Sequence, residues 1–137
     1  NILQGVENFA VGTPYTYKIA LYTGNAVLNQ STAAYTTTNE VTGSGYTAGG
    51  ITLAGRSVSV SGSYVILMGN PVTFTANAAG FSGARWGLIY KDSGAPLTSP
   101  LKARLDLGTT RSNVGGDLVI NWAGTGTNKV LKAKWSA

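Results

Sequence analysis

The residues that could carry out acid-base or metal chemistry are few in this sequence. Its 137 residues include no histidine and no cysteine. Without these side chains, the Ser-His-Asp and Cys-His catalytic arrangements are excluded, as are the usual zinc and copper sites. Proton transfer at neutral pH most often uses histidine, so its absence also argues against general acid-base catalysis.

The remaining candidates for catalysis are five carboxylates: Glu7, Glu40, Asp92, Asp106 and Asp117. A glycosidase requires two carboxyl groups about 5–10 Å apart in a cleft. No two of the five are close in the sequence, and simpler roles are available. Asp92 begins a turn-forming Asp-Ser-Gly-Ala-Pro segment, Asp106 lies between basic neighbours, and Asp117 precedes an apolar run. We therefore predict a protein that is not an enzyme and has no catalytic residue, metal site or cofactor.

The glycine-rich stretch Gly-Ser-Gly-Tyr-Thr-Ala-Gly-Gly at residues 43–50 could suggest phosphate binding. It lacks the Gly-Lys-Ser/Thr ending of a P-loop, and no helical pattern follows it. The stretch instead predicts a wide turn between two strands.

The elements that must position these residues are predicted to be β-strands. Apolar and polar residues alternate with period two, and Gly, Pro, Asn and Ser separate the alternating runs, which is the pattern of strands. The predicted strands are residues 16–23, 34–41, 50–54, 56–61, 63–68, 71–76, 84–91, 101–107, 117–122 and 129–135. The run 101–107 alternates most clearly, whereas 34–41 is weak and is expected to be an exposed strand. The run 71–76 is expected to turn Val72, Phe74 and Ala76 inward.

Nine or ten short strands at regular spacing predict an all-β domain, an antiparallel sandwich or barrel. We place this single domain at residues 16–137. Residues 1–15 carry little alternation, and two interpretations remain open for them: an extended arm that reaches a neighbour, or a segment that lies on its own domain.

The low charge content favours a subunit that is packed into an assembly. Charged residues make up 11% of the chain, against about 25% in ordinary soluble domains. The net charge of +5 favours an acidic partner. The basic residues are scattered, with one cluster at Lys129, Lys132 and Lys134, so nucleic acid is an unlikely partner. No apolar run approaches the about 20 residues of a membrane span, so no membrane contact is expected.

The aromatic residues offer an alternative function. Seven tyrosines and three tryptophans could line a carbohydrate-binding face. Trp86 and Trp122 have apolar neighbours in their strands and are predicted to lie in the core. Trp135 is expected to anchor the C-terminal segment to the domain or to a partner.

One long block of the sequence resembles a family of small virion proteins of tailed phages and prophages. Residues 18–55 follow the family pattern K-x-A-L-Y-T, then T-x-A-Y-T, then E-V-x-G-x-G-Y-T-x-G-G-x-x-L. The stretches at 84–94 and 105–108 are also similar to the family, so the resemblance extends from residue 16 to about residue 108. The spacing of the tyrosines and glycines is long and unusual, which makes the resemblance specific.

The resemblance implies a capsid cement or decoration subunit with a jelly-roll-like sandwich fold. Its partners would be the major capsid protein and further copies of itself, on the capsid exterior of a particle assembled in the bacterial cytoplasm. A tail-associated or fibre-base structural protein, or a carbohydrate-binding adhesion module, would be compatible with the same sequence. From the charge cluster and the two terminal segments, we infer a partner interface. Its candidate residues are Asn1, Ile2, Leu3, Lys129, Lys132, Lys134 and Trp135.

Overall fold

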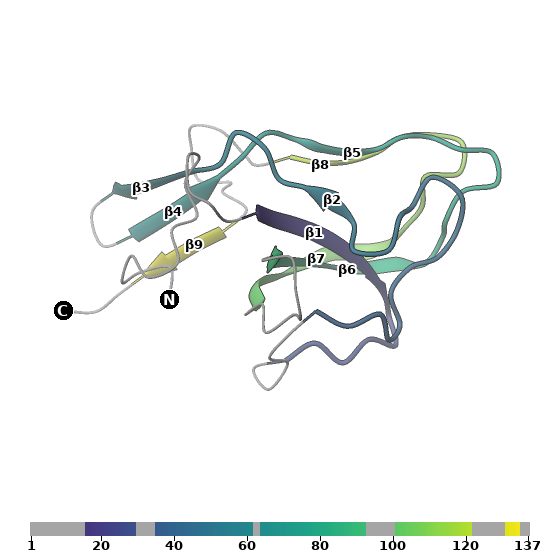
Figure 1. The fold of residues 1–137 in the computed structure, drawn as a ribbon, viewed down its shortest axis with the longest axis horizontal. Coiled ribbons are helices and arrows are strands. Elements are labelled where there is room, and N and C mark those ends of the chain that lie inside the picture. The colour runs from purple at the N-terminus through teal and green to yellow at the C-terminus, as the bar shows by residue number, and fades with distance from the viewer. Residues whose placement is uncertain (1–15, 30–34, 62–63, 93–100, 122–130, 135–137) are drawn as a thin grey trace.

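The computed structural model of the chain consists of strands and loops. It describes residues 16–29, 35–61, 64–92, 101–121 and 131–134, and no helix occurs within these ranges. The strands are β1 (Thr16–Thr23), β2 (Ile51–Thr52), β3 (Ser57–Ser61), β4 (Tyr64–Met68), β5 (Val72–Phe74), β6 (Ala84–Asp92), β7 (Leu101–Arg111), β8 (Leu118–Ile120) and β9 (Leu131–Lys134). They pair in antiparallel fashion, which confirms the predicted all-β class (Figure 1).

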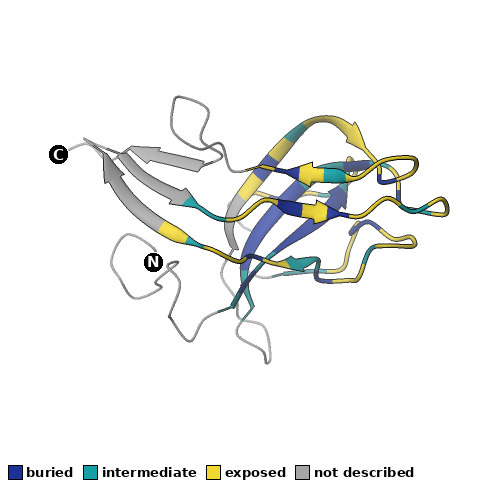
Figure 2. Cartoon of the chain, turned by 90° about the horizontal axis from the view of Figure 1, so that it is seen from above, coloured by how far each residue is buried: buried dark blue, intermediate teal, exposed yellow. Residues whose placement is uncertain are grey.

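The largest sheet has four strands in the order β2-β1-β6-β7. Its centre is the β1–β6 pair, in which Ile19 lies opposite Ile89 and Tyr22 opposite Trp86. Both strands are rich in β-branched and aromatic residues, which pack well on a pleated surface. Ala20 to Tyr22 are all buried, so the alternation predicted for β1 holds only near its start. Figure 2 shows the buried residues concentrated in this part of the molecule.

The two faces of the four-stranded sheet contact two different groups of residues. On one face, Tyr17, Ile19 and Leu21 join a core cluster with Phe74 of β5 and Ile120 of β8. The β5–β8 pair therefore forms a second layer over this face. The opposite face contributes a smaller cluster of buried residues, which consists of Ala20, Tyr22, Leu28, Leu88 and Tyr90.

The remaining sheet has three strands in the order β3-β4-β9. It continues from the β5–β8 pair, because β4 leads into β5 along the chain. The backbone N–H of Asn70, between β4 and β5, donates to the carbonyl of Ala54, between β2 and β3, at 2.9 Å. In Figure 1 this sheet extends beyond the start of β1, away from the end of the molecule where the loops after β5 and β7 lie.

Two details of the predicted strands are wrong. Residues 35–41 form a loop with a single bridge between Tyr22 and Glu40, and Glu40 is buried. The predicted exposed strand fails because this carboxylate turns inward to several donors. In the run 71–76, Val72 and Phe74 are buried as predicted, but Ala76 is exposed because β5 ends at Phe74.

Candidate functional site

The interface residues predicted from the sequence fall mostly outside the part of the chain that the structure describes. Asn1, Ile2, Leu3, Lys129 and Trp135 all lie outside the described residues. Lys132 and Lys134 belong to β9, which is an edge strand of the three-stranded sheet. In the pairing register Lys132 lies opposite Ile66 and Lys134 opposite Tyr64. The structure thus places part of the lysine cluster on a sheet edge.

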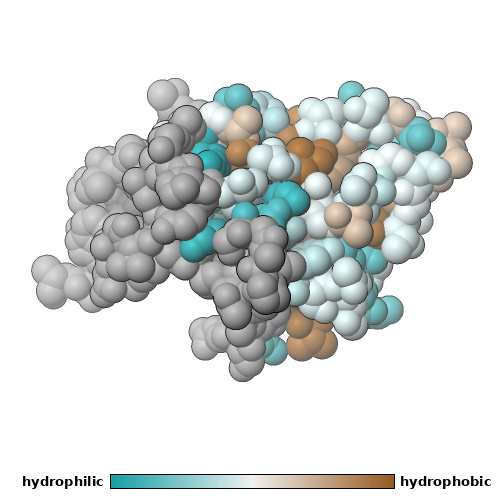
Figure 3. Space-filling view, in the orientation of Figure 1, coloured by the Kyte–Doolittle hydropathy of each residue, from teal (hydrophilic) through white to brown (hydrophobic). Residues whose placement is uncertain are grey.

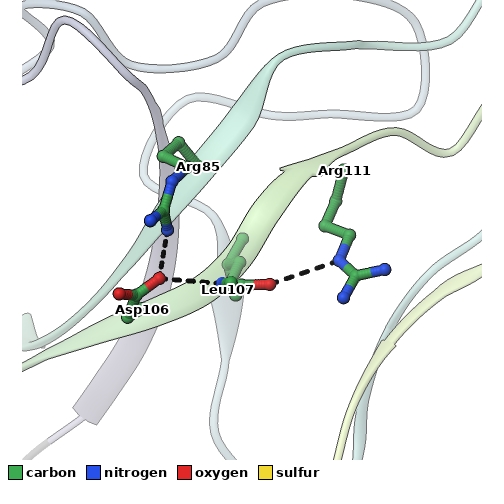
Figure 4. Close-up of polar contacts among 5 residues, drawn as sticks. Arg85, Asp106, Leu107 and Arg111 are labelled. Carbon is green, nitrogen blue, oxygen red and sulfur yellow. Dashed lines mark hydrogen bonds and ion pairs between the residues drawn. The ribbon is translucent and has the colours of Figure 1, made fainter.

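Three of the described carboxylates have partners near the surface of the domain. Asp92 forms an ion pair with Lys18 at 2.5 Å. Asp106 forms an ion pair with Arg85 and accepts a hydrogen bond from the backbone N–H of Gly108 (Figure 4). These bonds hold the pKa of the Asp106 carboxyl below its usual range, chiefly through Arg85. Asp117 accepts a hydrogen bond from the backbone N–H of Ala76 at 2.7 Å and so links the start of β8 to the end of β5.

Among the residues whose burial the structure describes, Glu40 is the only buried charged residue, with 7% of its surface exposed. Its Oε2 accepts a hydrogen bond from the Tyr35 hydroxyl at 2.5 Å. Its Oε1 accepts one from the Tyr46 hydroxyl at 2.6 Å and one from the backbone N–H of Gly49 at 2.7 Å. A buried carboxylate is tolerated only when such donors compensate for lost hydration. We call Glu40, Tyr35, Tyr46 and Gly49 the Glu40 cluster.

The Glu40 cluster joins the loop at 35–50 to the central strands of the sheet. The Tyr46 hydroxyl accepts a hydrogen bond from the backbone N–H of Leu21 in β1 at 2.9 Å. The Tyr90 hydroxyl of β6 donates to the carbonyl of Gly49 at 2.7 Å, and the Tyr90 ring stacks on Tyr35 with centroids 4.9 Å apart. One carboxylate therefore fixes two parts of the loop against two neighbouring strands.

The tyrosines around Glu40 are held in their neutral form. Burial raises the pKa of Tyr46 and of Tyr35, and in both residues the hydrogen bond to Glu40 raises it further. Burial also raises the pKa of Tyr22 and of Tyr90, with a smaller contribution from nearby negative charge. A tyrosine acting as a base or nucleophile needs a lowered pKa. These hydroxyls are therefore suited to donating hydrogen bonds within the fold.

The sequence analysis missed the Glu40 cluster, although it contained a signal. Glu40, Tyr46 and Gly49 all belong to the third segment of the family pattern, E-V-x-G-x-G-Y-T-x-G-G. The segment was predicted to be only a wide turn, and it does form a turn with left-handed glycines at 45, 49 and 50. A glutamate and a tyrosine at fixed positions around such a turn could have suggested that the turn folds over the carboxylate.

A second polar centre ties together the loops at one end of the domain. Asn113 has none of its surface exposed. Its Oδ1 accepts from the backbone N–H of Phe81 at 2.8 Å, and its Nδ2 donates to the carbonyl of Thr75 at 2.9 Å. The loop after β7 is therefore fixed to the loop between β5 and β6 by side-chain as well as backbone bonds.

An open groove of about 480 Å³ lies between the end of β7 and β8. Its walls are made by Leu107, Arg111, Asp117, Leu118, Val119 and Ile120. Among the described strands, β7 pairs only with β6 and β8 only with β5, so both are sheet edges. The groove thus combines apolar side chains, one charge of each sign and two strand edges.

Within the described ranges, no group of three or more metal-ligating side chains occurs. These ranges also contain no helix long and apolar enough to cross a membrane. A comparison with protein-family models, curated proteins and solved structures found no match to this chain. Among the described residues, the structural features that bear on a function are the Glu40 cluster, which fixes the loop at 35–50, and the charged and apolar side chains of the surface.

Proposed function

We propose that the chain is a structural subunit of a tailed-phage particle, a cement or decoration protein on the outside of the capsid. It binds the shell of the major capsid protein, associates with copies of itself and stabilises the shell without catalysing a reaction. The observation that carries this proposal is the resemblance of residues 18–55 to small virion proteins.

The proposal is supported by what residues 18–55 do in the structure. Tyr35, Glu40, Tyr46 and Gly49 of this block form the Glu40 cluster, and Tyr22 is buried beside it. The characteristic residues therefore fix a loop to a sheet. Residues that hold the loop rigidly against the sheet are suited to a subunit that acts through its shape and surface.

The fold and surface are also compatible with a role in a shell. The β5–β8 pair packs on the four-stranded sheet. We interpret this arrangement as part of a jelly-roll-like sandwich of nine or ten strands. The described part of the face in Figure 3 is mostly pale, with scattered strongly hydrophilic spots and a few hydrophobic ones. Weakly polar surfaces lose little hydration on contact, and sheet edges such as β3 and β9 can accept a strand from a neighbour.

Purified particles provide the test of this proposal. A cement subunit should be present in numbers comparable to the major capsid protein, and removing it should lower the temperature at which heads release DNA. Copy number would be measured by quantitative mass spectrometry of separated heads and tails. Presence in tails alone would overturn the proposal in favour of a tail or fibre-base protein. Binding to a glycan array without binding to heads would instead favour an adhesion module.

A further inference from the structure

Two guanidinium groups lie against one tryptophan on the surface formed by β6 and β7. The Cζ atom of Arg85 is 4.3 Å from the ring centroid of Trp86, and that of Arg104 is 4.7 Å from it. Trp86 is half-buried and packs against the smaller core cluster. Its predicted place in the core is therefore only half correct, because the residue remains partly exposed.

The two arginines differ in their remaining partners. Arg85 forms an ion pair with Asp106, and Figure 4 shows its side chain directed from β6 towards this carboxylate on β7. Arg104 is exposed, and its Nη1 donates to the carbonyl of Leu28 at 2.9 Å. Asp106 offsets one of the two positive charges, so this group of side chains retains one net positive charge.

An exposed apolar residue lies next to the backbone group that Arg104 contacts. Val27 precedes Leu28 and has 77% of its surface exposed. Leu28 itself is buried. The hydrogen bond from Arg104 to its carbonyl fixes this loop to β7. We call Val27, Arg85, Trp86, Arg104 and Asp106 the Arg–Trp patch.

We propose that the Arg–Trp patch binds an acidic segment of the shell protein. Arg104 pairs with a carboxylate of this segment, and Trp86 and Val27 provide apolar contact. An arginine has five N–H donors in a planar fork, so Arg104 retains donors for a carboxylate after its bond to Leu28. Tryptophan and arginine are the residues most enriched at the energetic centres of protein interfaces. This inference rests on the proposed cement function and adds the docking surface and the chemistry of its partner.

The charge of the patch favours a protein partner over nucleic acid. Binding to a phosphate backbone takes many contacts with basic residues. The Arg–Trp patch has two basic residues and one acidic residue, and so offers a single net charge. One oriented guanidinium beside apolar surface is instead suited to a single carboxylate on a folded surface.

The decisive experiment measures binding of the full chain to shells that lack it, by cosedimentation. Arg104→Glu should weaken binding at least about tenfold, as expected for an interface arginine that contributes strongly. Arg111→Glu makes the same charge change further along β7, beyond Leu107 in Figure 4, and should leave binding within about twofold. Val27→Asp places a negative charge on a side chain that is 77% exposed, and it should also weaken binding severalfold.

The outcomes separate this inference from the function on which it rests. If the unaltered chain does not bind shells, the proposed cement function fails, and this inference fails with it. If the chain binds but Arg104→Glu and Val27→Asp bind equally well, the patch is not the docking surface and only this inference is overturned. Near-ultraviolet circular dichroism of each variant establishes that it is folded. Arg104→Lys keeps the charge but not the fork, and its binding should be intermediate.

Discussion

At the scale of single residues, the carboxylate of Glu40 is expected to be worth more to stability than any other described carboxylate. Glu40→Gln replaces one acceptor oxygen with an N–H₂ group that faces the donors of Tyr35, Tyr46 or Gly49. A buried donor left without an acceptor costs about 1–3 kcal/mol. We expect urea denaturation to show a loss of about 2–4 kcal/mol in the free energy of unfolding, since more than one bond is affected.

Asp106→Asn is the matched control for this substitution, because it makes the same chemical change at a carboxylate whose side chain is 59% exposed. Exposed ion pairs contribute little to stability, so its cost should remain under about 1 kcal/mol. Equal costs for the two variants would contradict the role assigned to Glu40.

The tyrosines around Glu40 should make the domain sensitive to alkali. Free tyrosine ionises near pH 10, and burial raises the pKa of Tyr46, Tyr35, Tyr22 and Tyr90 in the folded chain. Above about pH 10 the unfolded chain loses these protons while the folded chain retains them. Stability should therefore be fully present below pH 10 and fall progressively above it.

The measurement for this pH dependence is urea unfolding across the alkaline range, with tyrosinate absorbance recorded for the folded chain. Tyr46→Phe removes one group with a raised pKa. This variant should be less stable at neutral pH but should lose stability less steeply with rising pH. An unchanged slope would show that Tyr46 is not among the groups responsible.

At the scale of elements, two glycines with the same φ angle allow the cost of backbone strain to be distinguished from the cost of a steric clash. Gly50 and Gly83 both have φ +77, in the left-handed region that disfavours side chains. A Cβ added to Gly50 would lie 1.8 Å from the carbonyl oxygen of Ile19, whereas one added to Gly83 meets nothing within 4 Å. The turn at Gly50 thus lies directly against β1.

Substitution of each glycine by alanine tests this difference. Gly83→Ala should lower the free energy of unfolding by about 1–2 kcal/mol, which is the cost of the backbone strain alone. Gly50→Ala should cost several kcal/mol more or prevent folding, because the turn has to move away from the central strand. Differential scanning calorimetry of both variants measures the difference. Similar melting temperatures would show that the close contact at Gly50 is relieved without cost.

The elements were predicted well where side chains alternate and poorly where polar bonds decide the structure. In β7 the alternation predicted Leu105 inside and Arg104 and Asp106 outside, and the structure confirms all three. The loop at 35–41 was predicted to be a strand, because its threonines favour strands when only propensity is considered. Glu40 overrides this propensity through partners at Tyr46 and Gly49, and pattern reasoning does not identify such partners in advance.

At the scale of the whole molecule, the net charge of +5 should determine how binding responds to salt. Contacts between exposed charges are screened over about 8–10 Å at physiological ionic strength, so attachment to an acidic shell should weaken as salt is added. Replacing Lys129, Lys132 and Lys134 by glutamine would lower the net charge to +2, that is, +5 minus three lysines. The salt dependence of binding should then become shallower.

Replacing the same three lysines by arginine is the control, because it retains the charge and should retain the salt dependence. Cosedimentation with shells over a range of salt concentrations measures both variants and the unaltered chain. If the glutamine variant binds less tightly with an unchanged salt dependence, the lysines contribute to attachment by a route other than charge. A binding constant of the unaltered chain that does not change with salt would contradict an acidic partner. It would indicate that apolar contacts such as those of Trp86 and Val27 dominate attachment.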